Sequence, residues 1–234
     1  MNEIRFTIDG KACTARPGQT IAAAAKANGV YIPTLCHFEG LKPAGSCRIC
    51  TVRSNGRYVA ACTQIVLDGM VLENAVPELE EMRRAIIEML FVSGNHLCPA
   101  CEKSGNCELQ ALAYRYQVLV PRFPYLWPVR TVDAEAPLIM LDRNRCIRCL
   151  RCVRGIQTRD GKKVFAGGGR GFEATIEVDQ ALAAALPEED ARRAMDNCPV
   201  GAILFKGKGF AKPIGTRRFD HAPIGSDVEK GSAR

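Results

Sequence analysis

Long apolar runs and aromatic side chains are scarce in this chain of 234 residues. No apolar run approaches the roughly 20 residues of a membrane-spanning helix, and residues 1–10 lack the apolar core of a secretion signal. Aromatic residues make up 6% of the chain, and no nucleic-acid recognition motif accompanies its net charge of +7. These absences lead us to expect a cytoplasmic protein that binds neither a membrane nor nucleic acid.

Cysteine, in contrast, is abundant, with 12 residues, several of them in C-x2-C spacing. A secreted protein would pair its cysteines as disulfides. The C-x2-C spacing instead favours cysteines that bind a metal, either zinc or the iron of an iron–sulfur cluster. Three sets of four candidate ligands follow in chain order: a first set of Cys36, Cys47, Cys50 and Cys62, a central set of His96, Cys98, Cys101 and Cys107, and a third set of Cys146, Cys149, Cys152 and Cys198. Only Cys13 is left over, and we expect it to behave as a small hydrophobic residue.

The N-terminal region has the sequence signals of strand, hairpin, strand and helix. Polar and apolar side chains alternate over residues 3–8, which predicts a short strand. Asp9-Gly10 is a strong hairpin signal, and residues 11–15 can return as the second strand. Thr20 can cap a helix over residues 21–28. This order is typical of the start of a β-grasp domain, with the first set of cysteines in the loops that follow.

Two helices are expected around the central set. The first begins at Pro77, carries acidic residues in its first turn and ends at Gly94, and the second covers residues 108–116. The apolar residues expected to form the core face of the first helix are Leu79, Met82, Ile86 and Leu90. After the second helix, four prolines within residues 118–137 predict an extended connector. We expect its aromatic residues to pack on neighbouring modules or to face a partner subunit: Phe123, Tyr125 and Trp127.

The third set combines a compact cysteine run with one distant cysteine before a proline. A bacterial ferredoxin has its fourth cysteine four residues after the run, but here that position is Ile156. Cys198-Pro199 fits the fourth ligand, and no cysteine lies between residues 152 and 198. The pattern is that of a two-cluster ferredoxin fold that has kept one [4Fe–4S] cluster.

Two further stretches could have indicated ligand binding. Residues 167–171 are rich in glycine but do not stand between a strand and a helix, so we predict a loop between strands and no flavin or NAD site. From Lys206 onward there are seven Lys or Arg residues and three Asp or Glu residues. This basic tail is either a solvated end or a segment that docks on an acidic partner.

Two cysteine runs carry a family resemblance. The run Gly-x-Cys-Arg-x-Cys at residues 45–50 and the run Cys-Pro-x-Cys-x-Lys-x-Gly-x-Cys-x-Leu-Gln at residues 98–110 resemble the N-terminal part of the large iron–sulfur subunit of respiratory NADH dehydrogenase. The resemblance implies an α+β protein with a β-grasp [2Fe–2S] domain at 1–76, a small helical His/Cys3 [4Fe–4S] domain at 77–117, the connector at 118–137, a bacterial-ferredoxin-like [4Fe–4S] domain at 138–211 and the basic tail at 212–234.

A chain of this length resembles the small diaphorase subunits of soluble, bidirectional NAD-reducing nickel–iron hydrogenases. The resemblance implies one [2Fe–2S] cluster on the first set and [4Fe–4S] clusters on the central and third sets. It also implies partners that hold the other cofactors: FMN and NAD on a larger diaphorase subunit, and nickel–iron on hydrogenase small and large subunits. The chain would then be an electron-transfer subunit with no substrate site of its own.

One departure and two alternatives accompany this interpretation. Relatives usually have three residues between the ligand histidine and the first cysteine, whereas here Leu97 alone separates His96 from Cys98. The chain could also be the iron–sulfur subunit of an NAD-linked formate dehydrogenase or of a complex I-like NADH dehydrogenase. A zinc-stabilised interaction scaffold is the alternative from a different functional class.

Overall fold

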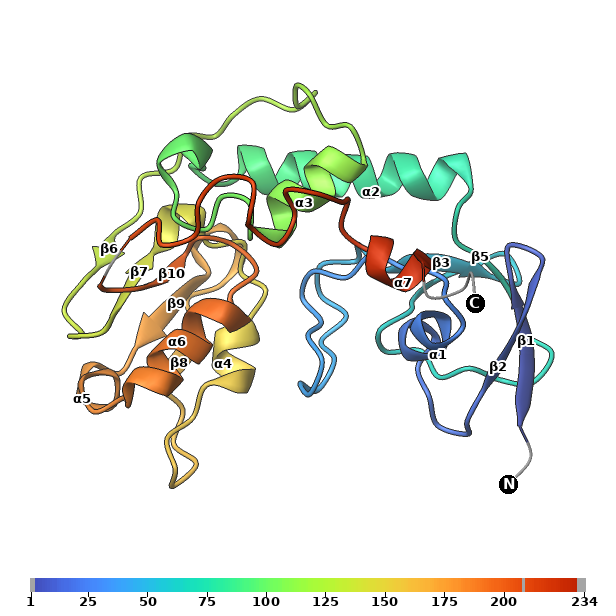
Figure 1. Ribbon diagram of the computed structural model, residues 1–234, viewed down its shortest axis with the longest axis horizontal. Coiled ribbons are helices and arrows are strands. Elements are labelled where there is room, and N and C mark those ends of the chain that lie inside the picture. Colours follow the sequence, from blue (N-terminus) through green and yellow to red (C-terminus); the bar gives the residue numbers. More distant parts are fainter. Residues whose placement is uncertain (1–2, 208, 231–234) are drawn as a thin grey trace.

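A computed structural model describes residues 3–207 and 209–230, and it has two lobes joined along one side by a long helix (Figure 1). The N-terminal lobe contains a five-stranded sheet in the order β2-β1-β5-β3-β4, in which β1 and β5 are parallel. Its elements are β1 (Ile4–Ile8), β2 (Lys11–Ala15), α1 (Ile21–Ala27), β3 (Thr51–Ser54), β4 (Arg57–Ala60) and β5 (Val71–Glu73). This is the β-grasp arrangement predicted from the sequence.

Local signals account for the start of this lobe. Asp9 and Gly10 adopt φ values of 49° and 77°, as a tight hairpin turn requires, and β1 pairs with β2 on either side. The Thr20 hydroxyl accepts a hydrogen bond from the Ala23 amide at 3.3 Å and so caps α1. The helix ends at Ala27, one residue before the predicted end.

The long joining helix is α2 (Pro77–Val92), which begins at Pro77 as predicted. Of the four residues predicted for the core face, Leu79 is buried, and Ile86 and Leu90 are half-buried and pack against the apolar core. Ile87 and Val92, which were not predicted, are buried as well. Arg83 is also buried, at 2% exposure, and its guanidinium donates to the carbonyl oxygens of Thr51 and Asn74 at 2.9 Å. These bonds turn the helix so that a charged residue faces the N-terminal lobe.

A short 3₁₀ turn (η1, Cys98–Ala100) and helix α3 (Glu108–Arg115) follow α2 and lie beside it in Figure 1. The C-terminal lobe holds two small sheets, β10-β7-β6 and β8-β9. Its elements are β6 (Val132–Asp133), β7 (Ile139–Asp142), η2 (Arg143–Arg145), α4 (Arg151–Gly155), β8 (Phe165–Gly168), η3 (Gly171–Glu173), β9 (Thr175–Val178), α5 (Gln180–Ala184), α6 (Glu188–Asn197) and β10 (Ile203–Phe205). The glycine run ends β8 and turns toward β9, as predicted.

Two apolar cores stabilise the fold. One lies between α1 and the five-stranded sheet, and the other fills the C-terminal lobe and extends to α2 and α3. Leu35 and Ile49, which flank cysteines of the first set, belong to this second core and are fully buried. The loops of the first set are therefore packed against the C-terminal lobe as well as their own sheet.

The connector and the tail differ from the expectations for them. Phe123, Tyr125 and Trp127 are 37%, 45% and 65% exposed, so they are not buried against neighbouring modules, and the alternative that they face a partner subunit stays a prediction. The end of the connector forms β6, which pairs with β7. The tail is not a free end up to residue 230, because the Phe219 amide donates to the Gly105 carbonyl oxygen at 2.9 Å and helix α7 (Ser226–Lys230) lies against the N-terminal lobe (Figure 1).

Candidate metal centres

The four cysteines of the first set lie close together in the N-terminal lobe, where hydrogen bonds join their thiols. Cys36, Cys50 and Cys62 are at most 1% exposed, and Cys47 is half-buried. Hydrogen bonds from the thiols of Cys47 and Cys62 hold the pKa of Cys36 well below its usual range. A hydrogen bond from Cys62 likewise lowers the pKa of Cys50 to about 7. The same hydrogen bonds raise the pKa of Cys47 and Cys62, so two sulfurs of the set favour the thiolate form that binds iron and the other two favour the thiol.

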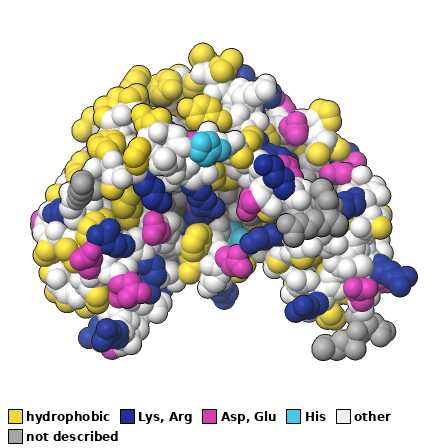
Figure 2. Space-filling view, viewed as in Figure 1, with side chains coloured by type: hydrophobic (Ala, Val, Ile, Leu, Met, Phe, Trp, Pro, Cys, Tyr) yellow, Lys and Arg dark blue, Asp and Glu magenta, His cyan; other side chains and the backbone are white. Residues whose placement is uncertain are grey.

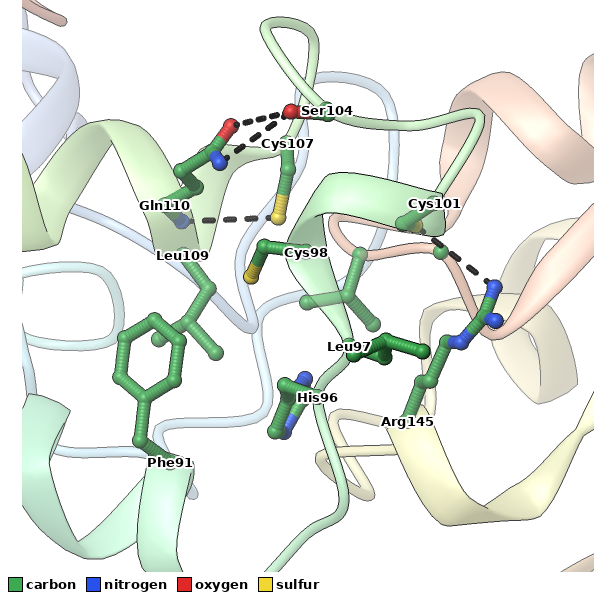
Figure 3. Close-up of a pocket in the computed structure, with 12 residues that line it drawn as sticks. Phe91, His96, Leu97, Cys98, Cys101, Ser104, Cys107, Leu109, Gln110 and Arg145 are labelled. Carbon is green, nitrogen blue, oxygen red and sulfur yellow. Dashed lines mark hydrogen bonds between the residues drawn. The ribbon is translucent and has the colours of Figure 1, made fainter.

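The central set lines one cavity between α2, η1 and α3 (Figure 3). His96, Cys98, Cys101 and Cys107 all face it, together with Phe91, Leu97, Leu109 and Val200. The tight turn after α2 brings His96 into this cavity despite its short spacing from Cys98.

Two observations fit His96 as an iron ligand. Its Nε2 atom is buried and has no hydrogen-bond partner, while the ring bonds to the backbone of Leu90. Burial lowers the pKa of His96, so the ring is neutral at pH 7. A buried nitrogen without a partner is costly, and a metal on Nε2 would remove that cost while Leu90 orients the ring.

The cavity also contains residues that are not candidate ligands but contact the ligand sulfurs. Gly201 packs so closely on the Cys101 sulfur that a side chain at this position would overlap it. The Gln110 amide donates to the Cys107 sulfur at 3.4 Å, and Arg145 Nη1 donates to the Cys101 sulfur at 3.7 Å. The position of Arg145 next to Cys146 was the only sequence signal for its role.

The third set lines an apolar cavity in the C-terminal lobe. Cys146, Cys149, Cys152 and Cys198 share it with residues such as Leu141, Ile176 and Ile203. Burial raises the pKa of Cys146 to about 11 and that of Cys149 to about 12. These thiols would be neutral at pH 7, and a bound cation such as iron would stabilise their thiolates here.

The ligands of the central and third sets surround cavities and do not converge on a single point. Zinc holds its sulfurs about 2.3 Å away in a tetrahedron, and so about 3.8 Å from one another. Among residues 3–207 and 209–230, no three His, Cys, Asp or Glu side chains form such a single-ion group. A cluster gives each thiolate its own iron or shares one between two, so more widely spaced ligands fit it better.

Known proteins with a similar sequence include the gamma subunit of the NAD-reducing hydrogenase HoxS of Cupriavidus necator. The two chains are 48% identical over 218 residues, which is 93% of each chain. This chain belongs to the HoxS gamma-subunit family. The resemblance to the small diaphorase subunits of NAD-reducing nickel–iron hydrogenases is thereby confirmed.

A solved structure and three family descriptions agree with this assignment. The crystal structure of an NAD⁺-reducing [NiFe]-hydrogenase in the H2-reduced state contains a chain with a TM-score of 0.89 and 42% identity, and 98% of each chain is covered. Residues 1–76 match a 2Fe-2S iron-sulfur cluster binding domain, residues 83–122 the NADH-ubiquinone oxidoreductase-G iron-sulfur binding region, and residues 136–204 the ferredoxin-like domain of NADH-quinone oxidoreductase subunit 3. The predicted fold class is confirmed.

Longer relatives occur among NADH dehydrogenases. A subunit of an NADH-quinone oxidoreductase of Rhizobium meliloti is 33% identical over 99% of this chain, and the mitochondrial NADH-ubiquinone oxidoreductase 78 kDa subunit of Candida albicans is 33% identical over 92%. This chain spans 30% of the length of either relative.

Within this member of the HoxS gamma family, the residues Arg154 and Val200 show which of the three sets are neighbours. Arg154 donates to the carbonyl oxygens of Cys36 at 2.6 Å and Cys149 at 3.1 Å, so the first and third sets are neighbours. Val200 lines the cavities of both the central and the third set, so these two share a wall. The third set therefore lies between the other two, an order that differs from their order in the sequence.

No helix among the described residues combines the length and the apolar character needed to cross a membrane.

Proposed function

We propose that this chain is the cytoplasmic electron-transfer subunit of an NAD-reducing nickel–iron hydrogenase. It passes single electrons between a diaphorase subunit that holds FMN and NAD(H) and the hydrogenase small and large subunits. The observation that carries the proposal is that each of three sets of four ligands is gathered in its own buried site.

The ligand assignment follows the sets. Cys36, Cys47, Cys50 and Cys62 would hold a [2Fe–2S] cluster; His96, Cys98, Cys101 and Cys107 a [4Fe–4S] cluster; and Cys146, Cys149, Cys152 and Cys198 a second [4Fe–4S] cluster. The bound clusters supply one-electron oxidation and reduction. The protein contributes burial, which excludes water, and N–H···S hydrogen bonds such as those from Gln110 and Arg148, both at 3.4 Å.

The arrangement of the sets supports a relay. Because the third set adjoins both others, the chain offers a path from the first set through the third to the central set. The first and central sets would then be the two ends at which partner subunits exchange electrons. A scaffold stabilised by zinc would have no need for three adjoining sites.

The connector supports the assembly with partner subunits. Eight of the twenty large hydrophobic side chains exposed in the described residues lie within residues 119–132. Figure 2 shows hydrophobic side chains gathered on the side of the molecule where the connector runs in Figure 1. An apolar surface of this kind is typical of a face buried in a permanent complex.

The alternative is an iron–sulfur subunit of an NAD-linked formate dehydrogenase or a complex I-like NADH dehydrogenase. The relatives from Rhizobium meliloti and Candida albicans favour it, because they are 33% identical over nearly all of this chain. Purifying the native complex decides between these functions. Co-purification with nickel-containing subunits and NADH formation from hydrogen would support the hydrogenase assignment, whereas formate or quinone activity would support the alternative.

The cluster content is tested on the full chain after anaerobic reconstitution. We expect about ten irons per chain, two for a [2Fe–2S] cluster and four for each [4Fe–4S] cluster, with broad visible absorption. We also expect no saturable binding of NADH or FMN by this chain in calorimetry. Stoichiometric zinc with little iron and no colour would refute the proposed function.

A further inference from the structure

Arg145 lies between the central and third sets. It is the last residue of η2 and directly precedes Cys146 of the third set. Its side chain extends to the cavity of the central set, where Nη1 donates to the Cys101 sulfur at 3.7 Å (Figure 3). One residue thus connects two ligand sets.

The position of the guanidinium is fixed from the opposite side. Its Nε atom lies 3.0 Å from the Asp142 carboxylate, and the side chains of Arg145 and Asp142 are 17% and 11% exposed. Asp142 is itself held, because it accepts a hydrogen bond from the Asn144 amide at 3.0 Å. The arginine is therefore oriented before any cluster binds, with one arm on the carboxylate and one on the sulfur.

A guanidinium in this position stabilises the two oxidation states of a cluster to different extents. A reduced cluster carries one more negative charge than an oxidised cluster, so a nearby cation stabilises the reduced state more. An N–H···S hydrogen bond acts in the same direction, because it withdraws electron density from the thiolate. Both effects are stronger where water is excluded.

We propose that Arg145 is a positioning residue that raises the reduction potential of the central cluster through its hydrogen bond to Cys101. This proposal rests on the proposed function, since it requires an iron–sulfur cluster on the central set. It makes electron transfer from the third set to the central set more favourable than the ligands alone would make it. No proton or bond is transferred, and one electron leaves one cluster and enters the other.

The test is a redox titration of the cluster-loaded full chain, followed by electron paramagnetic resonance, on wild type and Arg145→Gln. We expect the midpoint potential of the central cluster to fall by about 59 mV, which for one electron is a tenfold change in the equilibrium constant of its reduction. Arg145→Lys keeps the charge but loses the planar fork, so it should give a smaller shift in the same direction.

Arg148→Gln is the matched control. Arg148 carries the same charge and precedes Cys149 of the third set, but its side chain donates to the carbonyl oxygens of Gly171 and Phe172. Its bond to the Cys146 sulfur comes from the backbone amide, which the substitution retains. Its replacement should leave the midpoint of the central cluster unchanged. If the central cluster does not form in Arg145→Gln, the midpoint of this cluster in Arg145→Lys tests the proposal instead.

The outcomes separate this proposal from the proposed function. A central-cluster signal whose midpoint is the same in wild type and in the Arg145 variants would overturn the role of Arg145 and leave the function intact. A shift in Arg148→Gln as large as that in Arg145→Gln would also overturn it, because a general charge effect would then suffice. If wild type itself gave no signal from a central cluster, the proposed function would fail.

Discussion

The Arg151 guanidinium forms a two-armed ion pair with the Glu108 carboxylate, with N–O distances of 2.9 and 2.6 Å. The arginine side chain is 1% exposed, and its Nη2 atom also donates to the His37 carbonyl oxygen at 2.8 Å. Each of these three residues is next to a ligand of a different set, Cys152, Cys107 and Cys36 respectively. The contacts of one buried side chain therefore fix the positions of the three sites relative to one another.

Replacing Arg151 should strongly destabilise the fold. Arg151→Leu leaves the buried Glu108 carboxylate without its partner, and breaking a buried pair in this way costs about 3–5 kcal/mol. The measurement is the urea midpoint of the cluster-loaded chain. The matched control is Arg192→Leu, whose pair with Glu188 is exposed, because surface pairs contribute about 0–1 kcal/mol. Equal losses in the two variants would contradict the structural role of Arg151.

His96 can be tested as a ligand by two substitutions. His96→Ala should make the central cluster labile and convert it to [3Fe–4S], while the other two clusters stay intact. His96→Cys should retain four irons but lower the midpoint potential, since a thiolate donates more negative charge than a neutral imidazole. His221→Ala, at an exposed position, is the control. Paramagnetic resonance reads both effects, and an unchanged central signal in His96→Ala would remove His96 from the ligand set.

A methyl group at position 201 should selectively damage the central site. Gly201→Ala would place its Cβ within the space of the Cys101 sulfur, so the sulfur or the loop must move. We expect the central cluster to be lost or labile in the paramagnetic resonance spectrum, with the other two signals retained. In the control Gly167→Ala the nearest atom, in Leu150, is 4.0 Å from the new Cβ, so all three clusters should remain. A full set of clusters in Gly201→Ala would show that this contact is not limiting.

Cys13 should prove dispensable for metal binding. It is 3% exposed on β2, within the core between the sheet and α1, and burial raises the pKa of its thiol. Cys13→Ala should keep all the iron and lose about 1 kcal/mol of stability, which is usual for a single core substitution. Because the thiol is buried and protonated at pH 7, it should also react slowly with maleimide. The test is the iron content of Cys13→Ala. The comparison is Cys62→Ala, which should lose the [2Fe–2S] cluster, and a similar loss of iron in Cys13→Ala would show that Cys13 is a ligand.

The sequence by itself determined the ligand sets and the local elements around them. Cysteine spacing is a covalent property, and hairpins such as that at Asp9-Gly10 and caps such as Thr20 depend on a few adjacent residues. These signals therefore predicted the β-grasp start and the beginning of α2. They also identified the three sets of candidate ligands that the structure brings together.

Tertiary structure alone decided how the sites adjoin and what surrounds them. The burial of the charged residue Arg83 on α2 depends on its bond to Thr51, 32 positions away, and no helical periodicity contains that information. The hydrogen bond of Arg151 to His37 spans 114 positions, and that of Arg145 to Cys101 spans 44. Such contacts form only when separate loops pack on one core, so the order of the sites, with the third set in the middle, follows from packing and not from chain order.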